Sequence, residues 1–156
     1  RYGALRGEVL VRAGQPAVGQ GALQRALADW PEGEQTAARV RALRWSCQAA
    51  SELGQGAQAW ERLEAELSAC ADPRSQAALA LIRARVAQAR GEPEQALQAC
   101  RRARRLDPSY VSPYLIEATL LRGDRGARRA VVEAARRSVT DPAGRAALAA
   151  LEGRGR

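Results

Sequence analysis

The sequence predicts an all-α protein: a solenoid of about four helical hairpins with one further helix at its C-terminal end. Apolar residues make up 46% of the chain, and most are alanine or leucine, which stand near the top of the helix-propensity order. Proline recurs at spacings of 42, 35 and 34 residues, at Pro31, Pro73, Pro108 and Pro142. A period near 34 residues indicates stacked helical hairpins, in which each unit buries its apolar face against its neighbours.

Each of these prolines closes a repeated pattern of small residues. The residue 24 positions before the proline is always small: Gly7, Ala49, Ala84 or Ala118. The residue 17 positions before it is Gly14, Gly56 or Gly91, and in the last copy Arg125, with glycines at 123 and 126. We expect the small residues where the two helices of a hairpin approach most closely, since larger side chains would push the backbones apart.

Glycine and proline delimit the first two hairpins. Residues 1–13 and 17–29 should form the first hairpin, and Pro31 prevents its second helix from continuing. Residues 34–53 and 57–70 should form the second hairpin around a turn at Gly54-Gln55-Gly56. The 42-residue spacing of this copy predicts a first helix longer by about two turns, and its alignment puts Glu61 where a small residue is expected.

The last two hairpins and the terminal helix follow the same punctuation. Residues 73–90 pair with 93–106, and Pro73 and Pro93 stand at the first helical position, where proline is tolerated. Gly91 suits the left-handed conformation that ends a helix. Residues 109–122 pair with 126–139 around Gly123. Asp141 is the expected N-cap of a final helix over 142–152, whose leucines would cover the fourth hairpin.

These residues resemble the tetratricopeptide repeat. The third copy matches it best, through Ala84, Gly91, Ala96, Ala103 and Pro108, and the second copy is the most degenerate. The resemblance implies a right-handed superhelix and a single domain over residues 1–156, with repeats at about 1–31, 32–73, 74–108 and 109–142 and a capping helix at 142–152. We expect this domain to be part of a longer, bacterial-type protein.

The resemblance also implies a binding site, because tetratricopeptide arrays hold peptides or partner proteins on a concave face lined by the first helix of each hairpin. Carried over by position, the groove comprises Glu8, Arg12, Leu81, Arg85, Gln88, Leu115, Thr119 and Arg122, with Val11, Ser46, Ala50 and Leu53 in the same row. Arginine beside leucine would suit an acidic, partly apolar segment, because guanidinium binds carboxylates in two-point geometry. The alternative is that Arg85 and Arg122 are merely solvated. The family branch that clamps chaperone C-termini uses lysine and asparagine, which this chain lacks.

Charge is distributed unevenly along the chain. All 25 basic residues are arginine, and the whole net charge of +8 lies in residues 77–156. The densest cluster, here called the basic patch, comprises Arg101, Arg102, Arg104, Arg105, Arg128, Arg129, Arg136 and Arg137. It is either a solvated face or an electrostatic site for phosphate, an acidic partner or another part of the parent protein. Nucleic acid is not the expected partner, because its binders usually interleave aromatic residues or glycine-rich loops with basic ones.

Composition argues against catalysis, metal binding and cofactors. The chain has no histidine or lysine, which removes the commonest general base and the lysine of nucleotide-binding loops. Cys47, Cys70 and Cys100 are too widely spaced for a zinc site, and we expect buried thiols in a reducing, cytoplasmic compartment. The acidic cluster within residues 61–66 is expected to be a solvated face. No apolar run is long enough to span a membrane.

The sequence therefore predicts a non-catalytic scaffold or adaptor that binds another protein or a peptide in its concave groove. Two alternatives remain open. The arginine-rich second half could bind nucleic acid or an anionic surface, or the domain could be a structural spacer with no ligand of its own. Trp45 and Trp60 are expected to pack across the second hairpin.

Overall fold

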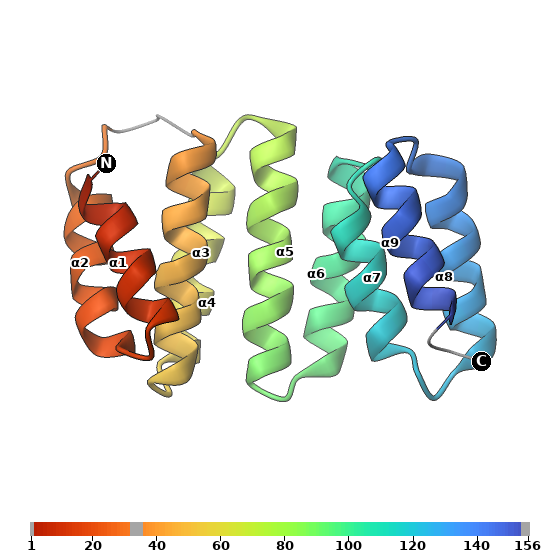
Figure 1. Ribbon diagram of the computed structural model, residues 1–156, viewed down its shortest axis with the longest axis horizontal. Coiled ribbons are helices and arrows are strands. Elements are labelled where there is room, and N and C mark those ends of the chain that lie inside the picture. Colours follow the sequence, from red (N-terminus) through yellow and green to blue (C-terminus); the bar gives the residue numbers. More distant parts are fainter. Residues whose placement is uncertain (1, 32–35, 154–156) are drawn as a thin grey trace.

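A computed structural model of the chain describes residues 2–31 and 36–153, and this part of the chain forms nine α-helices and no strand. The helices make four hairpins and a terminal helix, arranged side by side along the molecule (Figure 1). The hairpins are α1 (Tyr2–Arg12) with α2 (Pro16–Ala28), α3 (Ala37–Glu52) with α4 (Gly56–Ala69), α5 (Pro73–Ala89) with α6 (Pro93–Leu106), and α7 (Val111–Leu120) with α8 (Arg125–Ser138); α9 spans Pro142–Gly153. The predicted all-α hairpin solenoid is confirmed.

Three of the four hairpin turns share one backbone structure. Gly14, Gly54 and Gly91 adopt positive φ angles of 76°, 75° and 75°, a conformation that glycine reaches without steric cost. In each turn the N–H of the next residue donates to a carbonyl five residues earlier, as the Glu92 N–H does to Ala87 O at 2.9 Å. These glycines therefore align α1, α3 and α5 residue by residue, with offsets of 40 residues (14 to 54) and 37 residues (54 to 91).

This alignment corrects the expected register of the second hairpin. Its turn glycine is Gly54, whereas Gly56 is the first residue of α4, as Pro16 is the first of α2. The residue five positions after the turn glycine is then Ala59, which is 5% exposed, and not Glu61. The second copy therefore keeps a small residue at its helix contact.

The predicted two-turn extension of the first helix in this hairpin is wrong. Helix α3 has 16 residues against 17 in α5. The difference lies in the connections, because eight residues separate α2 from α3 and three separate α4 from α5. The prolines are also not equivalent, since Pro73 begins a helix and Pro108 precedes one. Residues 34 and 35, expected to start the longer helix, lie outside the described residues.

Short polar side chains start several helices. The carboxylate of Asp141 accepts a hydrogen bond from the Gly144 N–H at 2.7 Å, so its predicted role as an N-cap is confirmed. Asp72 caps α5 in the same way through the Ser75 N–H at 2.8 Å. Pro73 and Pro93 stand in the first turn of their helices, as expected.

The apolar core is divided along the stack. Helices α1 to α5 share one cluster, which includes Leu23, Leu43 and Leu63, while α7, α8 and α9 share a second. Between them lies a small cluster of Ala84, Ala99 and Cys100, against which the partly buried Ile116 of α7 packs. Because these side chains are short, the joint between the third and fourth hairpins has less apolar surface to bury than the rest of the stack.

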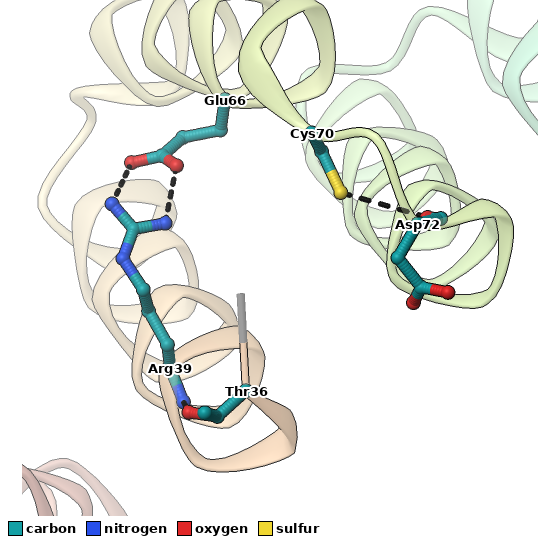
Figure 2. Close-up of polar contacts among 5 residues, drawn as sticks. All are labelled: Thr36, Arg39, Glu66, Cys70 and Asp72. Carbon is teal, nitrogen blue, oxygen red and sulfur yellow. Dashed lines mark hydrogen bonds and ion pairs between the residues drawn. The ribbon is translucent and has the colours of Figure 1, made fainter. Parts of the chain in front are cut away.

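Ion pairs join α4 to its neighbours. The carboxylate of Glu66 accepts two hydrogen bonds from Arg39 of α3, and the side chains are 13% and 15% exposed (Figure 2). Glu64 pairs with Arg83 of α5. The acidic cluster expected to be a solvated face therefore links helices at two of its three residues, while Glu61 is exposed.

Each of the two central tryptophans lies under a guanidinium group of a neighbouring hairpin. The Arg12 guanidinium carbon is 4.8 Å from the Trp45 ring centroid, and that of Arg83 is 3.8 Å from the Trp60 centroid. Both rings are partly buried and pack against the first core cluster. They therefore contribute cation–π contacts between hairpins in addition to apolar packing.

Candidate peptide-binding groove

The inner faces of α1, α3 and α5 enclose a hollow of about 400 Å³, here called the inner groove. Its larger lining side chains are Arg12, Arg44, Trp45, Leu81, Arg85 and Tyr110. A second hollow of about 160 Å³ continues it between α3 and α5 and shares Arg44, Ile82 and Arg85 with it. The two hollows lie next to each other along the α3–α5 contact, and the second is also lined by Glu52.

Helical periodicity places these side chains together. Leu81 and Arg85 are four residues apart on α5, so they lie on one face of that helix, with Ile82 beside them. Arg44 and Trp45 come from the facing side of α3. The result is an aliphatic floor with guanidinium groups and aromatic rings around it.

Two arginines near the groove are neutralised by a buried carboxylate. Glu8 is 4% exposed and accepts hydrogen bonds from Arg41 at 2.7 and 2.8 Å. Arg12 pairs with the same carboxylate at 2.9 Å. The hydrogen bonds from Arg41 hold the pKa of Glu8 below its ordinary value, although burial alone would raise it. Glu8 therefore belongs to the α1–α3 contact and does not present a free carboxylate to a ligand.

Arg44 and Arg85 have no carboxylate partner among the residues that the structure describes. Arg44 lies 5.5 Å from the Trp45 centroid, and both guanidinium groups line the inner groove. Burial of Arg85, followed by the nearby positive charge of Arg44, lowers the pKa of Arg85 below its ordinary value. Both side chains are exposed, so this pair is a solvated positive charge beside the groove, in line with the solvated alternative for Arg85.

The structure brings together some of the predicted groove residues and separates others. Arg12, Leu81 and Arg85 line the inner groove, and Gln88 is exposed outside its lining. Leu115, Thr119 and Arg122 line a different hollow of about 530 Å³, between α7 and α9. Helix α9 packs on α7 and forms one wall of this second space, so the expected row does not run as one groove along the whole stack. In the same expected row, Val11, Ser46 and Ala50 are buried.

Sequence reasoning missed Arg44, Trp45 and Tyr110 as groove residues. The reason for missing Arg44 and Trp45 is that the sequence alignment took Gly56, not Gly54, as the turn glycine of the second hairpin. With Gly54 as its turn residue, Arg44 occupies the position that Leu81 occupies in α5. Tyr110 comes from the connection before α7, which a pattern based on helices does not include.

Arginines of the basic patch on α6 are partly used inside the molecule. Glu117 of α7 is 2% exposed and accepts hydrogen bonds from Arg101 at 3.3 Å and from Arg104. Arg104 also lies 4.6 Å from the Tyr114 centroid. Arg102 is 3.8 Å from Glu64, whereas Arg105 is exposed. This half of the patch therefore joins α6 to α7 and α4 more than it forms a free cationic surface.

The half of the patch on α8 is more open. Arg129 and Arg137 are exposed. Arg136 lies 3.3 Å from Glu133 on the same helix, with both side chains about half exposed. Arg128 donates to the Leu151 carbonyl of α9 at 3.3 Å. The structure thus divides the patch between structural contacts and solvent.

The part of the chain that the structure describes contains no candidate metal site, and its three thiols are buried. No cluster of three carboxylate, thiol or imidazole side chains occurs there that could hold a metal ion. Cys47, Cys70 and Cys100 are buried free thiols, as expected. Burial raises the pKa of Cys47 and of Cys100 to about 12. Among the described helices, none combines the length and apolar character needed to cross a membrane.

The likeness to one solved structure supports the fold. No protein-family model matches the chain, and no curated protein matches it. The crystal structure of a thermophilic TPR (tetratricopeptide repeat) protein from Thermus thermophilus is similar, with a TM-score of 0.59 and 22% sequence identity. The match covers 96% of this chain and 79% of that chain. The chain is therefore a helical repeat protein with the tetratricopeptide-repeat fold.

Proposed function

We propose that this protein is a non-catalytic interaction scaffold that holds an acidic, partly apolar peptide segment in the inner groove. The observation that carries the proposal is the Arg44–Arg85 pair, two guanidinium groups that face one hollow with no carboxylate from the described chain. Both side chains are exposed, so their guanidinium groups are hydrated in the free protein and open to a ligand. A partner protein that supplies aspartate or glutamate side chains would pair with them in two-point geometry.

The groove offers complementary contacts to each part of such a segment. The Arg44 and Arg85 forks can each bind a carboxylate through two N–H donors. Leu81 and Ile82, each 5% exposed, form the apolar floor of the hollow against which the tip of an aliphatic side chain would rest. Trp45 and Tyr110 provide large, rigid surfaces of the kind that dominate binding energy at protein interfaces.

The test uses a short fluorescein-labelled peptide of alternating glutamate and leucine, and a matched peptide with glutamine at each glutamate. Binding is followed by fluorescence polarisation for the parent chain and for the double variant Arg44→Ala/Arg85→Ala. The control is Arg105→Ala/Arg129→Ala, which removes the same two charges from exposed positions outside the groove. We expect the groove variant to lose about tenfold or more in affinity, and the control to change by less than about threefold.

Three outcomes would contradict the proposal. Equal losses in both double variants would mean that net charge, and not the groove, attracts the peptide. Equal binding of the glutamate and glutamine peptides would remove the role of the carboxylates. No binding of either peptide at moderate ionic strength would favour a spacer without a ligand.

The alternative of an anionic surface or nucleic acid bound through the basic patch receives less support. Two arginines of the basic patch, Arg101 and Arg104, already donate hydrogen bonds to Glu117. They are therefore less available to an external anion. Heparin titration of the same two variants distinguishes the sites, because this alternative requires Arg105→Ala/Arg129→Ala to bind heparin more weakly with a shallower salt dependence.

A further inference from the structure

Helix α1 carries an apolar stripe that no described residue covers. Tyr2, Leu5 and Val9 are 93%, 56% and 63% exposed. Their spacing of three and four residues places them on one face of the helix. A contiguous apolar helix face in water usually marks a contact with another element.

The turn glycines show which face this is. With Gly14, Gly54 and Gly91 aligned, the stripe corresponds to Leu79, Ile82 and Val86 of α5, and to Ala42, Trp45 and Ala49 of α3. The three α5 residues are 0%, 5% and 2% exposed. The same face is therefore buried in an internal repeat and open in α1.

The structure also shows what covers this face inside the stack. The three α5 residues belong to one core cluster with Leu63 and Leu67 of α4, and α4 and α3 both pack on α5. Helices α1 and α2 pack on α3 in the corresponding way. The cover of α3 and of α5 is therefore the preceding hairpin, whose second helix presents leucines four residues apart, at 23 and 27 on α2 and at 63 and 67 on α4.

We infer that the Tyr2–Leu5–Val9 face of α1 docks a further helical hairpin of the same repeat type, placed ahead of α1 in the same polypeptide. Two of the three inter-hairpin connections, at 70–72 and 107–110, are short, so with a connection of that kind a hairpin seated on this face ends close to Tyr2. Arg6 is exposed beside the stripe and has no carboxylate partner among the described residues. The docked second helix therefore carries leucines at four-residue spacing and an acidic residue on the flank that meets Arg6.

A second copy of the chain fits this face less well. Head-to-tail stacking would require an open second helix at the far end, but α9 packs on both α7 and α8 there. Face-to-face pairing would bring Arg6 of one copy toward Arg6 of the other and would bury only a few apolar side chains. Like charges in contact oppose such pairing.

The test extends the full chain by a hairpin in register. Residues 36–77 are joined ahead of Arg1, so that Arg1 takes the place of Ala78 and the duplicated α4 meets α1 as the original meets α5. We expect added helical circular dichroism and a Tm at least about 5 °C higher than that of the parent chain. Val9→Glu should remove most of this gain in the extended chain and change the parent Tm little. Val18→Glu is the matched control, because Val18 is 57% exposed on α2, away from the stripe.

The outcomes separate the possible occupants. An extension that adds no helix, or equal effects of Val9→Glu and Val18→Glu in the extended chain, would overturn the proposal. A parent chain that sediments as a dimer and dissociates with Val9→Glu would identify a second copy as the occupant instead. The polypeptide sequence ahead of residue 1 gives an independent check: it should contain a helical hairpin with a leucine stripe ending within a few residues of Tyr2, and a tract without one would refute the inference.

Discussion

Replacing Glu117 with glutamine should uncouple the fourth hairpin from the rest of the stack. The apolar cluster at this joint has three small buried residues, Ala84, Ala99 and Cys100, and the fourth hairpin contributes one side chain to it, Ile116. The buried Glu117 carboxylate compensates by bonding to Arg101 and Arg104 across the α6–α7 contact. Glutamine keeps the shape of the side chain but removes the charge and one acceptor oxygen.

The expected loss of stability in Glu117→Gln follows from how deeply Glu117 and its two arginine partners are buried. Glu117 is 2% exposed, whereas the Arg104 and Arg101 side chains are 25% and 55% exposed. Breaking a fully buried ion pair costs about 3–5 kcal/mol, and solvent around Arg101 reduces this. A loss of about 2 kcal/mol corresponds to a decrease in Tm of about 4–8 °C for a chain of this size.

Two spectroscopic probes can show which part of the stack loses stability in the Glu117→Gln variant. Trp30, Trp45 and Trp60 all lie in the first two hairpins, so their fluorescence reports that part of the stack, while far-ultraviolet circular dichroism reports all the helices. In Glu117→Gln the circular dichroism should begin to change at a lower temperature than the fluorescence. Glu133→Gln is the control, because Glu133 forms an exposed pair on α8 that contributes little. Coincident curves with the parent midpoint would refute this account of the joint.

Further predictions concern acid stability, a turn and the thiols. The pKa of Glu8 lies below its ordinary value of 4.5, so the stability it contributes is complete above pH 4.5 and is lost as the pH falls through the lower folded-state pKa; in urea titrations Glu8→Gln should flatten that acid decline. Gly54→Ala should lower the free energy of unfolding by about 1–2 kcal/mol, because Gly54 has a positive φ that alanine adopts only with strain. Gly123→Ala should lower it little, because Gly123 has no positive φ and open space where a Cβ would lie; chemical denaturation of both variants measures the difference. With pKa values of about 12, Cys47 and Cys100 should react with a thiol reagent at pH 8 only as fast as the chain unfolds, and rapid native-state labelling would contradict their burial.

Local sequence signals were sufficient for the fold. Alanine and leucine content, glycine turns and prolines at helix starts gave helix ends within a few residues of those observed, as at Pro93 and Leu106. The error in the second hairpin arose because proline has two roles here, as a helix start at Pro73 and as part of a connection at Pro108. Proline spacing alone does not distinguish these roles, whereas the positive φ of Gly54 does.

The candidate site was only partly predictable, because it depends on which hairpins share a face. The prediction of Leu81 and Arg85 required only the third repeat, whose register was clear. Arg44 depended on the misaligned second hairpin. The burial of Glu8 depends on Arg41, 33 residues away, and such a pairing leaves no periodic signal in the sequence.

The geometry of the turns has a consequence for where this chain can vary in length. The glycine turns at 14, 54 and 91 close their hairpins identically at one rim of the stack, and α1, α3 and α5 enter the inner groove at fixed distances from that rim. At the opposite rim, residues 70–72 connect α4 to α5 and residues 107–110 connect α6 to α7 (Figure 1). A change in the length of a connection at that opposite rim would therefore leave the separations of Arg44 from Gly54 and of Arg85 from Gly91 unchanged, so the groove tolerates length variation there better than at the glycine turns.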